Sequence, residues 1–108
     1  MTPPGDDPAA GNADPGDANV LRRTLTICNK RGLHARAAAK FVTLAERFGA
    51  SVEVEKDGQS VSARSIMGLM MLGAGLGSAI DLRAEGWDAK EAIDALSALV
   101  EAGFHEQD

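Results

Sequence analysis

Apolar and polar residues alternate in several short segments after residue 20, which is the pattern of half-buried strands. The clearest example is Ser51-Val52-Glu53-Val54-Glu55, in which every second side chain is apolar. Asp57-Gly58 follows this segment and is a residue pair typical of a tight hairpin turn. We therefore predict four strands, over residues 21–28, 51–55, 60–63 and 78–84, with a hairpin joining the second to the third.

Residues 35–47 repeat their apolar side chains every three or four positions, which is the period of a helix packed on one side. Gly49 is expected to cap the C-terminus of this helix. Ser65 is expected to cap a short second helix over residues 66–72. Both predicted helices thus have a residue suited to one of their ends.

A third helix is predicted near the C-terminus, where Asp88 and Glu91 have the spacing of an N-terminal capping pair. Trp87 is expected to pack onto this helix as a hydrophobic staple. The complete order is β-α-β-β-α-β-α. Two crossover helices and one hairpin imply an α+β open-faced sandwich, in which a four-stranded antiparallel sheet carries three helices on one face.

Charge divides the chain into two unequal parts. Residues 1–20 contain four aspartates, no lysine or arginine and almost no large apolar side chain, so we expect a disordered acidic tail there and one domain over residues 21–108. That domain holds 12 acidic and 11 basic side chains, and the basic ones gather between residues 22 and 40. Such a basic face on a nearly neutral body favours an acidic protein partner or a phosphate, and not nucleic acid.

The residue inventory also limits the compartment and the chemistry. A single cysteine, Cys28, cannot form an internal disulfide or a cysteine-based zinc cage, which fits a reducing cytoplasm. No segment approaches the roughly 20 apolar residues that cross a bilayer, so no membrane insertion is expected. We find no motif for a metal, an organic cofactor or a nucleotide, and no carboxylate pair. An enzyme in its own right is therefore not expected.

The segment Gly32-Leu33-His34-Ala35-Arg36 places a histidine where an extended segment becomes a helix. The first backbone N–H groups of a helix lack partners within the helix, and the helix dipole is positive at this end. Together with Arg36, these groups would stabilise a dianion held on the imidazole ring. The pattern indicates a histidine that carries phosphate.

Three features resemble HPr, the histidine-containing phosphocarrier of the phosphoenolpyruvate-dependent phosphotransferase system. They are Gly32-Leu33-His34-Ala35-Arg36, Ser65-Ile66-Met67-Gly68-Leu69-Met70 and the predicted order of elements. The resemblance implies that His34 is phosphorylated on Nδ1 and that Arg36 faces the phosphate. It also implies enzyme I as the phosphoryl donor and a histidine of an EIIA-type protein as the acceptor. Ser65 falls on the serine that an HPr kinase/phosphorylase modifies in some members.

The second predicted helix is apolar nearly all round, so one side of it cannot be buried. We expect Ile66, Met67 and Met70 to form an exposed patch that, with Ala35 and Lys40, binds the partners in turn. Methionine side chains suit a surface that accepts several partners. The protein is expected to be a monomer.

Two further details concern the family branch and one departure from the family. Asn29-Lys30-Arg31-Gly32 and Gly103-Phe104 resemble the nitrogen-related regulatory branch, while an HPr of a sugar-transport system is the alternative. A regulatory binding domain without phosphotransfer is a third hypothesis. The family usually has proline where this chain has Ala37; because alanine is a strong helix former, we expect an intact helix with a slightly less rigid start.

Overall fold

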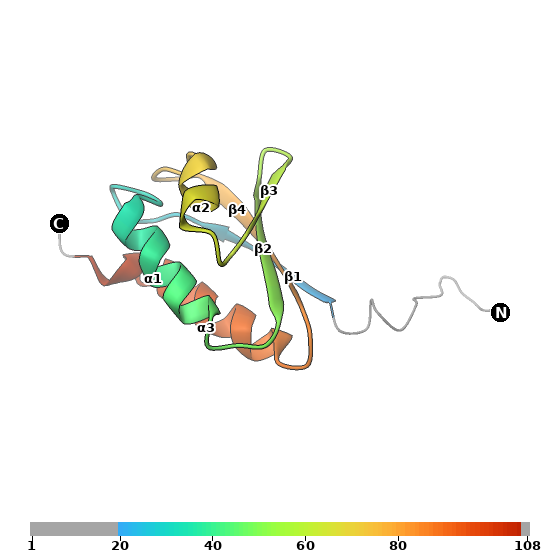
Figure 1. The fold of residues 1–108 in the computed structure, drawn as a ribbon. Coiled ribbons are helices and arrows are strands. Elements are labelled where there is room, and N and C mark those ends of the chain that lie inside the picture. The colour runs from blue at the N-terminus through green and yellow to red at the C-terminus, as the bar shows by residue number, and fades with distance from the viewer. Residues whose placement is uncertain (1–19, 107–108) are drawn as a thin grey trace.

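The fold is seen in a computed structural model, which describes residues 20–106. The strands are β1 (Val20–Thr26), β2 (Ser51–Lys56), β3 (Gln59–Ser62) and β4 (Ala79–Glu85), and the helices are α1 (Ala35–Ala45), α2 (Ile66–Met71) and α3 (Ala89–Glu101). The strands form one antiparallel sheet in the order β1-β4-β2-β3. The three helices lie on one side of the sheet (Figure 1), so the predicted open-faced α+β sandwich is confirmed.

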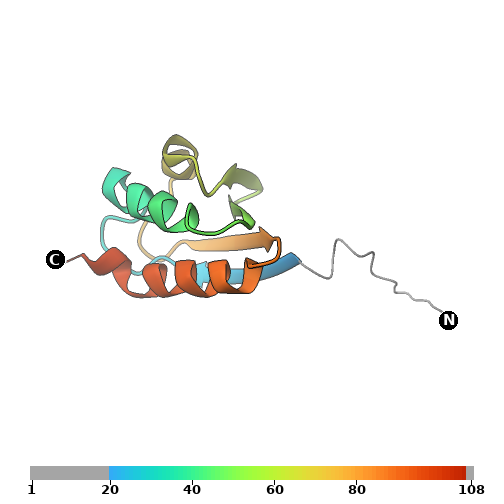
Figure 2. The same cartoon turned by 60° about the horizontal axis from the view of Figure 1, so that its bottom comes forward.

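The strand register brings apolar side chains together on the covered face of the sheet. Leu25 of β1 lies opposite Ile80 of β4, and Leu82 of β4 lies opposite Val54 of β2. All four side chains are buried. In Figure 2, α1 and α3 lie side by side, with α2 next to α1. Phe104, which follows α3, is fully buried in the same core.

The predicted hairpin and the predicted cap of α2 are both confirmed. Asp57 and Gly58 have φ angles of 53° and 82°, and such left-handed conformations at both central residues define the tight turn expected for this pair. Ser65 Oγ accepts a hydrogen bond from the Gly68 N–H at 2.9 Å. The short helix α2 therefore begins where its polar cap predicts.

The prediction that Gly49 caps α1 is wrong. The helix ends at Ala45, and the following residue, Glu46, has an ordinary right-handed φ of −69°. The Phe48 N–H then donates to the Ala45 carbonyl at 3.2 Å. Because the chain leaves the helix through this tighter turn, no left-handed glycine is needed at its end.

Two predictions at the start of α3 are also wrong. The Asp88 side chain does not cap α3, because its carboxylate accepts the N–H groups of Gly49 at 2.9 Å and Ala50 at 2.8 Å. Both backbone donors lie between α1 and β2, and the buried N–H of Ala50 would otherwise have no partner. Trp87 does not act as a staple: its side chain is 87% exposed, with the indole beside Gly49.

The predicted acidic tail falls almost wholly on residues 1–19, which lie outside the described residues; β1 already begins at Val20. Within residues 20–106, no helix has the length and apolar character needed to cross a membrane.

Candidate functional site

The loop that leads into α1 is locked against the loop that follows α2. Gly32 has a φ of +66°, and a Cβ at this position would lie 2.4 Å from the Ala74 carbonyl oxygen. That same oxygen accepts the Leu33 N–H at 2.9 Å. The left-handed conformation and the close backbone approach together require glycine. The position of His34 is therefore fixed by two loops that are distant in sequence.

His34 occupies the position before the first helical residue of α1. Its backbone is extended, with φ −74° and ψ 177°, and its carbonyl accepts the Ala38 N–H at 2.8 Å. Its side chain makes no capping hydrogen bond. The N–H groups of the first helical turn consequently have no partner within the helix, as predicted for an anion-binding helix start.

The His34 ring meets a carboxylate that sequence reasoning missed. His34 Nε2 lies within hydrogen-bond distance of Glu106 Oε2, and these side chains are only 14% and 12% exposed. An ionised carboxylate can only accept, so Nε2 carries the proton of this contact. When the ring is neutral, its free lone pair is then on Nδ1. The contact therefore distinguishes the two ring nitrogens and leaves Nδ1 as the one with a free lone pair.

The pKa of Glu106 lies below its ordinary value of 4.5, chiefly because His34 hydrogen-bonds to its carboxylate. A hydrogen bond from Asn29 and the positive charge of Arg31 act in the same direction, while burial opposes them. Glu106 is therefore ionised at neutral pH, as the contact with Nε2–H requires.

A turn near the C-terminus places the Glu106 carboxylate beside the His34 ring. Gly103, Phe104 and His105 have φ angles of 62°, 57° and 59°, an unusual run of left-handed residues. The turn is held by the buried Phe104 ring and by Lys40 Nζ, which donates to the Phe104 carbonyl at 2.6 Å. No motif marks Glu106 in the sequence, and 72 positions separate it from His34.

Within residues 20–106, none of the other predicted site residues forms a hydrogen bond or ion pair with the His34 ring. Arg36 is exposed in the first turn of α1, and within residues 20–106 it makes no ion pair. Ala35 is exposed beside it, whereas Lys40 is half-buried and turned toward the C-terminal turn. Ser65 lies at the start of α2, and α2 packs against α1.

The predicted apolar patch is present on α2. Ile66, Met67 and Met70 are 40%, 68% and 40% exposed, while Leu69 is fully buried. Met71 is also exposed, by 67%, which the sequence reasoning did not include. We call Ile66, Met67, Met70 and Met71 the α2 patch.

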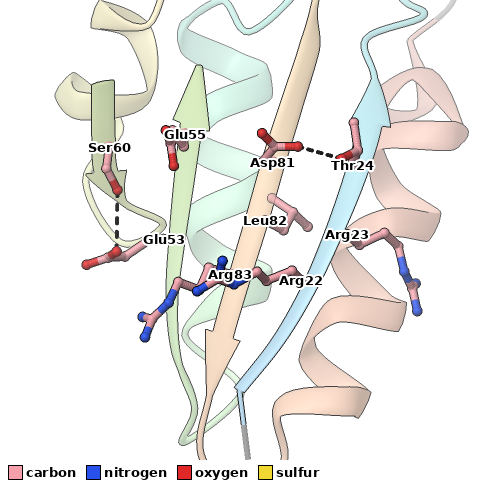
Figure 3. Close-up of a pocket in the computed structure, with 9 residues that line it drawn as sticks. All are labelled: Arg22, Arg23, Thr24, Glu53, Glu55, Ser60, Asp81, Leu82 and Arg83. Atoms are coloured by element: carbon pink, nitrogen blue, oxygen red, sulfur yellow. Dashed lines mark hydrogen bonds between the residues drawn. The ribbon is translucent and has the colours of Figure 1, made fainter. Parts of the chain in front are cut away.

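The uncovered face of the sheet carries a separate polar hollow (Figure 3). Arg22 and Arg83 lie together there, and Thr24 donates to Asp81 while Ser60 donates to Glu53. Positive and negative side chains balance one another on this face, which is typical of a solvated sheet surface. This polar hollow lies on the opposite side of the sheet from the helices and is not part of the His34 site. Among the residues that the structure describes, no cluster of three metal-binding side chains occurs.

Comparison with known proteins identifies the class. Residues 21–102 match the family model described as the PTS HPr component phosphorylation site. The chain is 51% identical over 87 residues to the phosphocarrier protein HPr of Cupriavidus necator, covering 81% of this chain and 98% of that protein. It is 49% identical over 86 residues to the phosphocarrier protein NPr of Shewanella violacea, covering 80% and 94%.

Solved structures agree with the sequence relatives. The HPr-C-His structure from Thermoanaerobacter tengcongensis matches with a TM-score of 0.78 and 49% identity, over 82% of this chain and 99% of that one. An HPr from Bacillus anthracis matches with a TM-score of 0.73 and 48% identity, over 75% and 96%. Fold and sequence thus define a phosphocarrier of the phosphotransferase system. The chain belongs to the HPr family, and the resemblance inferred from its motifs is confirmed.

Proposed function

We propose that His34 carries the phosphoryl group, bonded to Nδ1. The observation that supports this assignment is the contact between Nε2 and Glu106, which leaves Nδ1 as the nucleophilic nitrogen. The lone pair of Nδ1 attacks phosphorus on the phosphohistidine of enzyme I, and the bond between phosphorus and the donor nitrogen breaks. The donor ring keeps the electron pair. In the next step a histidine of an EIIA-type protein attacks the same phosphorus.

The start of α1 suits a group that must be held and then released. The free N–H groups and the helix dipole stabilise the phosphoryl charge, and the exposed Arg36 guanidinium adds a planar set of donors. These groups stabilise the phosphate without enclosing it, which favours transfer in both directions.

Enzyme I and the EIIA-type protein would dock on the same surface, the α2 patch together with Ala35 and Lys40. Four exposed apolar side chains on one short helix are typical of an interaction site. Because both partners would use this surface, their binding is mutually exclusive. The carrier would act as a monomer in the cytoplasm.

Ser65 is proposed as a site of regulatory phosphorylation by an HPr kinase/phosphorylase. Its hydroxyl caps α2 beside the α2 patch, so a phosphate there would place negative charge next to the docking surface. We expect Ser65→Asp to weaken enzyme I binding, measured by titration calorimetry, with little change in stability. Unchanged affinity would contradict the regulatory role.

The nitrogen-related branch is proposed over sugar transport because Asn29-Lys30-Arg31-Gly32 and Gly103-Phe104 resemble it. Relatives named NPr and HPr match at 49% and 51% identity, so the sugar-transport HPr is the second candidate.

One experiment tests the carrier role and the branch together. Labelled phosphoenolpyruvate is supplied with the nitrogen-branch or the sugar-branch enzyme I, and acid-labile label on the protein is measured. We expect label on the wild type, none on His34→Ala, and faster labelling by the nitrogen-branch enzyme. Label that persists in His34→Ala would refute the site, and faster labelling by the sugar-branch enzyme would reverse the branch.

A further inference from the structure

Asn29, just before the loop that leads to His34, is buried next to the site. Its side chain is 3% exposed, and its Nδ2 group donates to the Gly32 carbonyl at 2.9 Å and to Glu106 Oε1 at 3.1 Å. A carboxamide has two N–H donors, and both are used. One amide thus joins the turn at Gly32 to the C-terminal carboxylate.

Both oxygens of Glu106 are engaged as a result. Oε1 accepts from Asn29 and Oε2 accepts from His34. With one oxygen held by a buried amide, the carboxylate cannot rotate freely about its last bond. The amide therefore determines where the second oxygen meets the imidazole ring.

This arrangement carries a cost to the fold. Asn29 Oδ1 is buried, and within residues 20–106 it has no hydrogen-bond partner. An apolar side chain would remove this unpaired acceptor, but it would leave the Gly32 carbonyl and Glu106 Oε1 without the donor that the amide provides. An apolar side chain could not donate a hydrogen bond to Glu106, and this donation explains why the amide is present despite its cost.

We propose that Asn29 is a positioning residue for phosphoryl transfer, acting through Glu106 on the Nε2 proton of His34. The proposal rests on His34 being the phosphorylated residue. In the neutral ring, Nε2 keeps its proton and Nδ1 attacks phosphorus, which gives an Nδ1-phosphoimidazolium whose Nε2–H still points to Glu106. When the acceptor nitrogen attacks, the bond between phosphorus and Nδ1 breaks and its electron pair stays on Nδ1. The neutral ring returns with the same Nε2 proton.

Without the amide, Glu106 no longer holds this proton as firmly. The phosphorylated ring then loses it to water at a lower pH, and a ring without that proton is a poorer leaving group. Loading of His34 should change little, whereas onward transfer and hydrolysis should slow in mildly alkaline solution. In acid the solvent supplies the proton, and the difference should vanish.

The neighbouring charges stay the same in such a variant. The groups around the ring are Glu106 from the C-terminal turn, Arg31 from the loop, and Arg36 and Lys40 from α1. His105 is exposed next to Glu106 and is present in both proteins. A changed pH profile would therefore report on the Nε2 proton.

The test uses isolated phosphorylated protein of the full chain. The rate of phosphohistidine hydrolysis is followed from about pH 5 to pH 9 for wild type, Asn29→Ala, Glu106→Gln and the double variant. We expect Asn29→Ala to hydrolyse about threefold to tenfold more slowly near pH 8, as for the loss of one hydrogen bond, and equally fast near pH 5. Glu106→Gln should show the same shift, and the double variant no more than Glu106→Gln alone, because both act on one proton.

Ser97→Ala is the matched control. Ser97 is also 3% exposed, and its replacement by alanine removes one hydrogen bond, from Arg23, but Ser97 lies within α3. Its variant should keep the wild-type pH profile. If Asn29→Ala does not fold, Asn29→Ser, which keeps a small polar side chain at this buried position, takes its place in the comparison. An unchanged profile in Asn29→Ala and Glu106→Gln would overturn the inference, whereas a wild type that is never labelled on His34 would overturn the proposed function.

Discussion

At the scale of single residues, Gly32 shows how one backbone conformation places the site. Gly32 has a left-handed φ of +66°, and the Cβ of any other residue at this position would clash with the Ala74 carbonyl. The Leu33 N–H donates to that same carbonyl, so displacement of the loop would also remove this bond. The orientation of His34 thus depends on a residue that carries no chemistry itself.

We expect Gly32→Ala to lower the free energy of unfolding by about 1–3 kcal/mol, from backbone strain and the clash. Gly73→Ala is the control, because Gly73 also has a left-handed φ, +64°, but faces open space. Urea unfolding followed by circular dichroism measures both. Equal losses in the two variants would show that the approach to Ala74 adds nothing.

The ionisation of Glu106 makes a second prediction at this scale. Its pKa is lower in the folded protein than the ordinary 4.5, so the charged carboxylate stabilises the fold. That contribution is complete above the ordinary value and is lost as the pH falls through the lower folded value. We expect the difference in urea midpoint between wild type and Glu106→Gln to shrink below about pH 4.5. A difference that stays constant down to about pH 3 would contradict this.

At the scale of elements, what the sequence could predict depended on local signals. Asp57-Gly58 and Ser65 act on backbone groups within a few residues of themselves, and both were predicted correctly. Asp88 reaches N–H groups 38 and 39 positions away, so its local capping pattern was misleading. The candidate site at His34 could be located in the sequence, because the predicted helix begins directly after this residue. Its partner Glu106 could not, because only the completed fold brings the C-terminal turn to α1.

For α2 as well, the local sequence pattern predicted the helix but not which of its side chains another protein would cover. Its length leaves room for one fully buried residue, Leu69, and its other large side chains face outward. Apolar periodicity alone could not say which face another protein covers. We propose that the face covered by another protein is the α2 patch.

We expect Met67→Glu to lower the rate of phosphoryl transfer from enzyme I by about fivefold or more, since a charge buried in an apolar contact is costly. Stability should change by less than about 0.5 kcal/mol, because Met67 is exposed. Trp87→Ala is the control, as it removes an exposed apolar side chain at the other end of α1. Loss of transfer in both variants would argue against a local docking surface.

At the scale of the whole molecule, the sheet separates two surfaces of different character. One face is covered by helices that carry His34 and the α2 patch, and the other exposes balanced charges to solvent (Figure 3). The C-terminal turn contributes to both the core and the candidate site. Phe104 is buried in the core, and the Glu106 carboxylate contacts the His34 ring.

We expect Phe104→Ala to lower the free energy of unfolding by about 3–5 kcal/mol, as for other fully buried aromatic residues. Trp87→Ala also truncates an aromatic ring, but an exposed one, and should change stability by less than about 0.5 kcal/mol. Thermal and urea unfolding provide the comparison. A loss no larger than that of Trp87→Ala would mean that the C-terminal turn is not anchored by its phenylalanine.

The contact between His34 and Glu106 also has a consequence for folding. It joins residues 72 positions apart, so it forms only when nearly the whole chain has been organised. A molecule in which α3 has come loose loses Phe104 from the core and, with it, the carboxylate that restrains the histidine. Onward transfer from the phosphorylated ring would then slow in mildly alkaline solution before the remaining structure melts. The imidazole tautomer, read from its nitrogen chemical shifts, would serve as a sensor of intact tertiary structure.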